Sequence, residues 1–381
     1  MDKALMPKVS QNRLHKVMKL VHSGPPFPAS EWFTPLKVDP YGFELSDDFD
    51  YDSYEEFMAK YLSVLARRAK KWQYLLDHTN TVKKSGKVKR YVRKGIPSEH
   101  RGLMWATVSG VLELRDQNPD TYTKALSVKK NEELINAISI GTIMVIIMDF
   151  LNSKLIYVFR HSKNLPRQCI FQKMDEGHLG SLFNVLVAFA HYHTEIGYCQ
   201  GLNYIAGLLL LVVKDEEITF WLLTKLVSDI VPNYYTKKMD GLLQDIEVLS
   251  QLVSIKMPQI AAHIEKVDVT WPLIVTKWFV CLYAEVLPIE TILRIWDCLF
   301  YEGNKILFRV ALTLLKIHQD KILAAPDMPR VLEVFKQIVR DSDVLNCHEF
   351  MEGIFKEPGS LSREQIHKLR ASGNPQKTNY A

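Results

Sequence analysis

Residues 182–213 read LFNVLVAFAHYHTEIGYCQGLNYIAGLLLLVV, and this stretch decides the fold. Its first part, Leu182–Tyr192, and its last part, Leu202–Val213, are apolar nearly all round. A helix that is apolar on every side is buried deep inside a large helical protein. The glycine and polar residues between the two parts predict a structured turn that is held on two rigid helices.

The helical pattern continues on both sides of this stretch. From Asp52 to Leu76, apolar residues recur at three- and four-residue steps, which predicts a helix with one apolar face. From residue 95 onward almost every long segment is predicted to be helical, with proline or glycine between segments. These further predicted helices are Ile218–Val231, Leu242–Ile255, Trp278–Val286, Ile289–Phe300, Ile306–Ile317, Val331–Arg340 and Ser360–Arg370. We therefore expect an all-α fold, a multi-helix array.

The composition is that of a globular protein, with 47% hydrophobic and 24% charged residues. A net charge of +5 is too small to indicate a nucleic-acid partner. The 5 cysteines form no CxxC pair, so neither a disulfide framework nor a zinc ribbon is expected. Reduced thiols predict an intracellular, cytoplasmic protein. The most apolar uninterrupted stretch, Ala137–Met148, is shorter than the roughly 20 residues of a membrane span.

Residues 83–94 carry 7 lysines and arginines and are predicted to form a basic linker. The favoured interpretation is a solvated surface run, and contact with acidic lipid headgroups or an acidic partner stays open. Tyr91 is the only aromatic residue among these charges, so single-stranded nucleic acid is a poor fit.

The motifs of self-sufficient enzymes are absent. The chain has no GxxxxGK[ST] phosphate loop, no GxSxG elbow and no HExxH metal motif. His191 and His193 are two residues apart and would point to different faces of a helix, so a metal or Cys–His site with Cys199 is not favoured. We predict no metal, no cofactor and no independent active site.

The turn Gly197-Tyr198-Cys199-Gln200-Gly201-Leu202-Asn203 carries the most informative residues. Gly197 and Gly201 lack Cβ atoms and can allow close approach of another surface. The amide of Gln200 can donate and accept at once, which the orientation of a water molecule requires. The alternative is that Gln200 only satisfies the turn and the first amides of the next helix. From these residues alone the alternative is favoured.

Two other motifs favour a functional role for Gln200 over a purely structural one. One is Arg93-Lys94-Gly95-Ile96-Pro97 followed by Arg101-Gly102-Leu103-Met104-Trp105, and the other runs from Leu287-Pro288 through Arg294-Ile295-Trp296-Asp297 and Glu302-Gly303 to Leu312. Together with Tyr198-Cys199-Gln200-Gly201, this ordered set resembles the TBC domain, the catalytic domain of Rab GTPase-activating proteins. The resemblance runs from about Arg93 to about Phe355. The resemblance is closest to one group within the family, and three further segments indicate this group: residues 38–44, 54–72 and 357–361.

The resemblance implies an all-helical fold, a GTP-bound Rab as partner and a role in vesicle trafficking. It also implies catalysis in trans by an arginine from an IxxDxxR motif and a glutamine from a YxQ motif. The YxQ motif corresponds to Tyr198, Cys199 and Gln200, which makes Gln200 the candidate that orients water.

The same resemblance suggests Rab contacts at Tyr198, Gly201, Asn203 and Arg101. For Arg101 and Trp105, a buried structural pair that holds the first helix is an equally good interpretation. For Trp296 and Asp297 we favour a structural role.

The arginine motif is interrupted. Aligned from its front, residues 146–152 fit IxxDxx, but Asn152 stands where the arginine belongs. Aligned from its far end, Lys163 falls on the arginine position and Arg160 on the aspartate position. Lys163 is therefore the candidate catalytic cation, and the chain is expected to be a weakened activator. The alternative is a non-catalytic Rab-binding scaffold.

These patterns divide the chain into four parts. Residues 1–50 are predicted to be irregular, and residues 51–92 to hold one helix and the basic linker. Residues 93–355 form the TBC-like domain, which is interrupted by an irregular segment near 139–170. Residues 356–381 are predicted to form a last helix and a polar tail.

Overall fold

The structure is a computed structural model that describes residues 51–78, 82–128, 131–141 and 176–372. Helices and turns, but no β-strands, occur in these ranges, which confirms the all-α prediction. The N-terminal segment 1–50 and residues 142–175, with Lys163, lie outside them. None of the described helices is long and apolar enough to cross a membrane.

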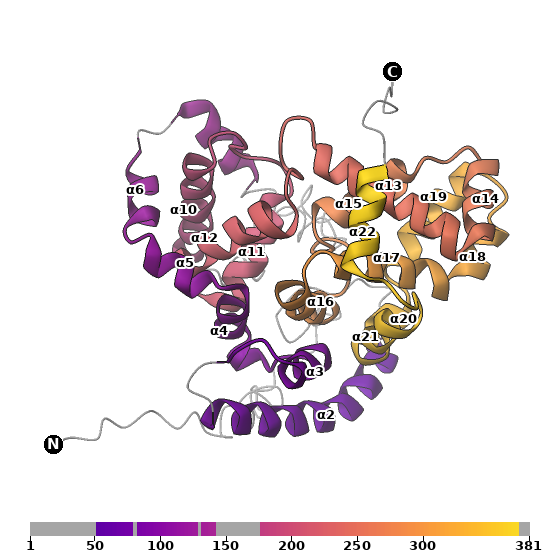
Figure 1. Ribbon diagram of the computed structural model, residues 1–381, viewed down its shortest axis with the longest axis horizontal. Helices are drawn as coiled ribbons and strands as arrows, with labels where there is room; N and C mark the ends of the chain where they lie inside the picture. The colour runs from indigo at the N-terminus through magenta and orange to yellow at the C-terminus, as the bar shows by residue number, and fades with distance from the viewer. Residues whose placement is uncertain (1–50, 79–81, 129–130, 142–175, 373–381) are drawn as a thin grey trace, which may run out of the picture. The chain divides into compact units, whose positions relative to one another are not determined.

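The described residues are built almost entirely of helices joined by turns (Figure 1). In chain order they are α2 (Tyr51–Asp77), α3 (Gly86–Lys94), α4 (Ser98–Ser109), α5 (Val111–Gln117), α6 (Thr121–Ser127), α10 (Glu176–Tyr192), α11 (Leu202–Val213), α12 (Glu216–Lys225), the π-helical turn η1 (Leu226–Ile230), α13 (Asp240–Lys256), α14 (Pro258–Lys266), α15 (Trp271–Val280), α16 (Ile289–Glu302), α17 (Lys305–Ile317), α18 (Gln319–Ala324), α19 (Met328–Gln337), α20 (Ser342–Leu345), α21 (Cys347–Lys356) and α22 (Arg363–Ser372). Residues 132–141 are also helical.

Helix α16 occupies the middle of the array, where α3, α4, α17 and α21 pack around it (Figure 1). All of its residues from Thr291 to Glu302 are buried. Beside this group, α10, α11 and α12 pack on one another, and the apolar stretch that decides the fold supplies two of the three. Leu186 and Leu209 are almost fully buried, as helices that are apolar on every side require.

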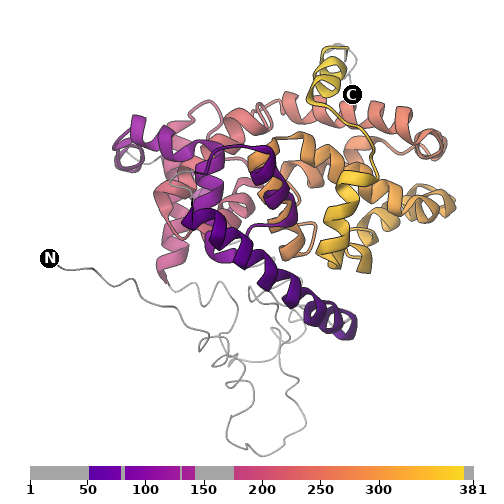
Figure 2. The ribbon, with the colours of Figure 1, turned by 60° about the horizontal axis from the view of Figure 1, so that its bottom comes forward.

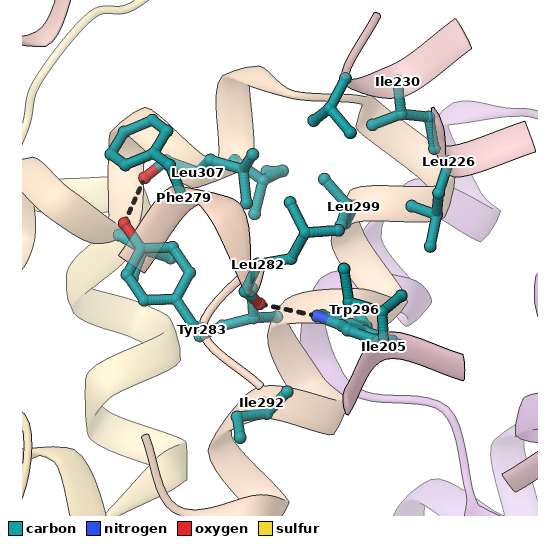
Figure 3. Close-up of a cluster of buried hydrophobic side chains, with 14 of the residues drawn as sticks. Ile205, Leu226, Ile230, Phe279, Leu282, Tyr283, Ile292, Trp296, Leu299 and Leu307 are labelled. Atoms are coloured by element: carbon teal, nitrogen blue, oxygen red, sulfur yellow. Dashed lines mark hydrogen bonds between the residues drawn. The ribbon is translucent and has the colours of Figure 1, made fainter. Parts of the chain in front are cut away.

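Two polar atoms inside the core find backbone partners, as the close-up of the apolar cluster shows (Figure 3). The indole of Trp296 donates from Nε1 to the carbonyl of Leu282 at 3.0 Å (Figure 3). The hydroxyl of Tyr283 donates to the carbonyl of Leu307 at 2.9 Å (Figure 3). Buried polar groups must be paired in this way to avoid a desolvation cost.

The long helix α2 lies beside α3 in both views (Figures 1 and 2). Trp72 anchors it, because its ring is 1% exposed and its Nε1 donates to the carbonyl of Gly95 at 3.0 Å. The chain at Gly95 has φ of 106°, a region that favours glycine, and a Cβ there would meet the Arg294 side chain at 2.5 Å. Glycine at this position therefore lets α3 approach α16.

The predicted basic linker is wrong for residues 86–94, which form α3. Val88 and Val92 are buried one turn apart, and Ser85 caps the helix by accepting from the Val88 amide at 3.2 Å. Two apolar residues among many charges gave too weak a periodic signal to predict a helix.

The helix predicted at 278–286 is also displaced, since α15 ends at Val280. Leu282 and Tyr283 have φ of 47° and 65°, a left-handed conformation that stops a helix. Pro272 lies in the first turn of α15 and not between helices, because a proline there lacks only a hydrogen bond that the helix would not make.

Candidate functional site

The turn between α10 and α11 is fixed at both ends. The Gly197 amide donates to the carbonyl of His193 at 2.8 Å and closes the end of α10. Gly197 and Gly201 have φ of 63° and 110°, which glycine adopts without strain. Gly201 is buried, and a Cβ there would lie 3.5 Å from the carbonyl of Val280. The turn is thus a defined structure on a buried scaffold.

Asn203 holds the turn from inside. Its side chain is fully buried, and its Oδ1 accepts a hydrogen bond from the Gly201 amide at 3.0 Å. Its Nδ2 donates to the carbonyl of Gly141 at 2.9 Å. One amide side chain therefore ties the turn to the helical residues 132–141, which precede the interrupted motif. A direct contact of Asn203 with a Rab stays a prediction.

Gln200 differs from Asn203 in its exposure and in the hydrogen bonds of its side chain. It is exposed, and its side-chain amide makes no hydrogen bond with any residue that the structure describes. The alternative role of satisfying the turn belongs to Asn203, which accepts the Gly201 amide. Within the described residues, nothing occupies the Gln200 amide, and its exposure makes it accessible to a group outside the chain.

Tyr198 packs against the end of the helical stretch 132–141. A Cβ at Gly141 would lie 1.8 Å from the Tyr198 hydroxyl, so only glycine leaves room for this ring. The hydroxyl is buried, and no hydrogen-bond partner for it occurs in the described ranges. Burial raises the pKa of Tyr198 to about 12, so the phenol is neutral at physiological pH. The turn and the beginning of the interrupted segment meet at this contact.

The histidines next to the turn have local partners. His191 Nδ1 lies 2.8 Å from the carbonyl of Ala125, and His193 Nδ1 lies 3.2 Å from Glu195 Oε1. Neither belongs, with Cys199, to a cluster of possible metal ligands in the described part of the chain. Burial raises the pKa of the Cys199 thiol, which makes it a poor nucleophile.

Arg101 lies in a buried polar cluster rather than on the surface. Its side chain is 3% exposed, and its Nε donates to Asp297 Oδ1 at 3.1 Å. Trp105 Nε1 donates to the same oxygen at 2.8 Å, and the Ile96 amide donates to Oδ2 at 2.9 Å. This geometry supports the interpretation of Arg101 and Trp105 as a structural pair, and a Rab contact of Arg101 remains an untested prediction.

Two more charged residues of α16 extend this cluster, and we call Arg294, Asp297 and Glu302 the α16 hub. Arg294 donates to the Tyr61 hydroxyl of α2 at 2.7 Å. Glu302 accepts two hydrogen bonds from Arg93 of α3, at 2.6 and 2.8 Å. The sequence motifs near residues 93–105 and 294–302 are thus the two halves of one buried hub.

The structural roles of Asn203 in the turn and of Gly141 beneath Tyr198 were not predicted from the sequence. An asparagine two residues after a glycine at a helix start is a signal for a side chain that caps the turn. No local signal exists for Gly141, because its partner Tyr198 is far away in the sequence.

The chain was compared with known proteins. The family model described as the Rab-GTPase-TBC domain matches residues 98–323. Growth hormone-regulated TBC protein 1-A of Danio rerio is 47% identical over 336 residues, which cover 88% of this chain and 89% of the relative. Growth hormone-regulated TBC protein 1 of Homo sapiens is 46% identical over 337 residues, which cover 88% and 94%. This group is the one that the narrower sequence resemblance indicated.

A solved structure is similar as well. The TBC domain of the Chlamydomonas flagellar RabGAP superposes with a TM-score of 0.67 at 26% identity, covering 84% of this chain and 100% of that domain.

Proposed function

The chain belongs to the Rab-GTPase-TBC domain family, and we propose that it binds a GTP-loaded Rab protein and supplies Gln200 in trans to the hydrolysis of GTP. Family membership supports a regulator of the Rab-GAP type. One observation carries the finer proposal. The amide of Gln200 is exposed and has no partner among the described residues, on a turn that Asn203 holds by accepting from the Gly201 amide.

The chemistry follows from the demands of phosphoryl transfer. The attacking water must be aligned with the γ-phosphorus, and charge develops on the γ-phosphoryl oxygens. An amide can accept a hydrogen bond from that water and donate another to a phosphate oxygen. Because the turn is preorganised, little conformational entropy is lost when Gln200 reaches the nucleotide.

The second requirement is a cation near the developing charge. We propose Lys163 for this position, since the far-end alignment of the interrupted motif puts it where the arginine belongs. A lysine offers a point charge without the planar fork that grips two oxygens, so we expect a weakened activator.

The test is a panel of GTP-loaded Rabs assayed for phosphate release with the full chain. Gln200→Ala should lower the stimulated rate by about 10²–10³-fold, in the range seen when one preorganised donor is removed. Gln337→Ala is the matched control, because Gln337 is an exposed glutamine on α19 whose side chain donates to Glu333 on the same helix. A Gln200→Ala protein with the normal rate would assign Gln200 a structural role.

The other candidate function is a scaffold that binds a Rab without catalysis. The absence of an arginine from the interrupted motif favours it. Rab binding at full affinity with no phosphate release by the wild-type chain would select the scaffold over the activator.

Peripheral membrane contact rests on a separate feature, the exposed basic side chains of residues 83–94. Lys89 and Arg93 are engaged by Glu302, whereas Lys83, Lys84, Lys87, Arg90 and Lys94 are exposed. We propose that these five face acidic lipid headgroups. Binding to phosphatidylserine vesicles should disappear when all five are changed to glutamine, and binding that persists would exclude this surface.

A further inference from the structure

A buried histidine far along the chain faces two carboxylates. His318 lies between α17 and α18 and is 1% exposed. Its Nε2 lies 3.5 Å from Asp341 Oδ2 and 3.7 Å from Asp343 Oδ2, at the start of α20. Neither approach forms a hydrogen bond, and Nε2 has no other hydrogen-bond partner among the residues described.

The other ring nitrogen fixes the tautomer of His318. Its Nδ1 lies 3.0 Å from the carbonyl of Leu314. A carbonyl only accepts, so Nδ1 carries the hydrogen, and in the neutral ring Nε2 presents a lone pair to the two carboxylates. Three electron-rich atoms that face one another call for a positive charge between them. A histidine that donates its other N–H to a backbone carbonyl is also the usual arrangement of a metal ligand.

The spacing of the three groups fits an ion better than a hydrogen bond. One ligand atom from each of His318, Asp341 and Asp343 can be chosen so that all lie within 4.8 Å of one another. In a tetrahedral zinc site with bonds of about 2.0–2.1 Å, two ligand atoms are about 3.3 Å apart. The distances of 3.5 and 3.7 Å from Nε2 are close to this value. They exceed the roughly 2.7–3.2 Å of a good N–H···O hydrogen bond.

We propose that His318, Asp341 and Asp343 bind a divalent cation of the zinc type. One imidazole and two carboxylates are a ligand set that suits Zn²⁺, with water in the fourth position. Asp343 is 58% exposed, so solvent has access to the ion. The ion would tie the end of α17 to the start of α20, away from the turn that carries Gln200.

Lys321 offers a test of the proposal, because its removal should change the cation affinity in the opposite direction from the removal of a ligand. Its ammonium group contacts Asp341 Oδ2 and so competes with a cation for the same carboxylate. The lysine side chain is 59% exposed and can move into water when an ion enters. Removal of Lys321 should therefore tighten cation binding, whereas removal of a ligand should weaken it.

The experiment uses the full chain, stripped with a chelator and titrated with Zn²⁺ against a competing chromophoric chelator. His318→Gln and Asp343→Asn should each weaken the tightest site by more than the ~10–100-fold that loss of an outer-shell partner costs. Lys321→Gln should tighten it. His263→Gln is the matched control, since His263 Nε2 is also buried and unpartnered in the described structure but belongs to no such cluster.

Asp343→Asn keeps the test decisive if His318→Gln fails to fold, because Asp343 is largely exposed. Zn²⁺ should also raise the thermal midpoint of the wild type but not of Asp343→Asn. Equal zinc affinity in the wild type and Asp343→Asn, or no tightening in Lys321→Gln, would overturn the site and leave an ion pair of His318 with the carboxylates.

Discussion

Gln200 and Asp297 both lie in motifs that identify the family, but within the described structure only the side chain of Asp297 forms hydrogen bonds. Asp297 is fully buried and accepts from Ile96, Arg101 and Trp105. Gln200 is exposed and has no partner in the ranges that the structure describes. A saturated buried group stabilises the fold, whereas an unsatisfied group on a rigid surface turn is available to a partner. Motif membership alone does not distinguish the two roles.

The largest expected effect concerns the cation that should accompany Gln200. Replacing residues 142–170 with a family-type segment that contains IxxDxxR, which keeps Gly141 and its contacts with Tyr198 and Asn203, should raise Rab-stimulated phosphate release by up to ~10³–10⁵-fold, or roughly 4–7 kcal/mol. The reason is that an arginine stabilises charge that an oriented water cannot neutralise. The same replacement with alanine at the arginine is the control. No gain over the wild type would mean that another residue, with Arg160 and Arg167 the nearest arginines, already fills this position.

Asp297, the buried residue of the two, should affect the stability of the fold and not the catalytic step. Asp297→Ala should lower the free energy of unfolding by about 3–5 kcal/mol, because it removes a buried carboxylate that is paired with the buried Arg101 guanidinium. Urea denaturation followed by circular dichroism measures this loss. Asp116→Ala removes an exposed ion pair with Arg115 and should cost less than about 1 kcal/mol. A similar loss in the free energy of unfolding for the two variants would show that Asp297 does not stabilise the α16 hub.

The hub should also give the protein a defined acid sensitivity. Burial opposes ionisation of Glu302, but hydrogen bonds from Arg93 and Lys305 outweigh it and lower its pKa from 4.5 to about 2. A depressed carboxylate pKa contributes stability above pH 4.5, and that stability is lost as the pH falls toward 2. This linkage amounts to about 3 kcal/mol for a shift of this size. Glu302→Gln should flatten the stability curve between these pH values, and an unchanged curve would contradict the assignment.

Asn203 is buried and hydrogen-bonded like Asp297, but it holds the exposed turn that carries Gln200. Asn203→Ala should cost about 1–3 kcal/mol, because it leaves the Gly201 amide and the Gly141 carbonyl unpaired. It should also lower Rab-stimulated hydrolysis through loss of order in the turn. Asn118→Ala is the control, as its amide also bonds a backbone carbonyl, that of Leu114, away from the turn. Equal Rab-stimulated hydrolysis in Asn203→Ala and Asn118→Ala would show that Asn203 does not contribute to the activity of the turn.

The smallest expected effect is on the stability of Gln200→Ala. Since the side chain is exposed and unpartnered within the described structure, the free energy of unfolding should change by no more than about 0.5 kcal/mol. Thermal denaturation measures it beside the phosphate-release assay. A large loss of stability would show that Gln200 supports the turn and would weaken the contrast with Asp297.

Local patterns in the sequence were sufficient for much of this protein. The apolarity of Leu182–Tyr192 and Leu202–Val213 predicted buried helices, and the structure has helices at both. The glycines at 197 and 201 predicted the turn between them, because only a few residue types adopt its conformation. Such features depend on neighbours within a few residues, which a sequence displays directly.

The roles of the motif residues depended on the tertiary structure. Asp297 reaches Arg101 across 196 positions, and Asn203 reaches Gly141 across 62. Helix α3 formed where a linker was predicted, because Val88 and Val92 gain stability only from the core that they enter. Sequence patterns alone were enough to predict the all-α class, the two buried helices and the family, but not α3 or the end of α15. Only the packing decided that Asp297 is buried with three partners and that Gln200 is exposed with none among the described residues, because hydrogen-bond partners and burial are properties of groups brought together in space.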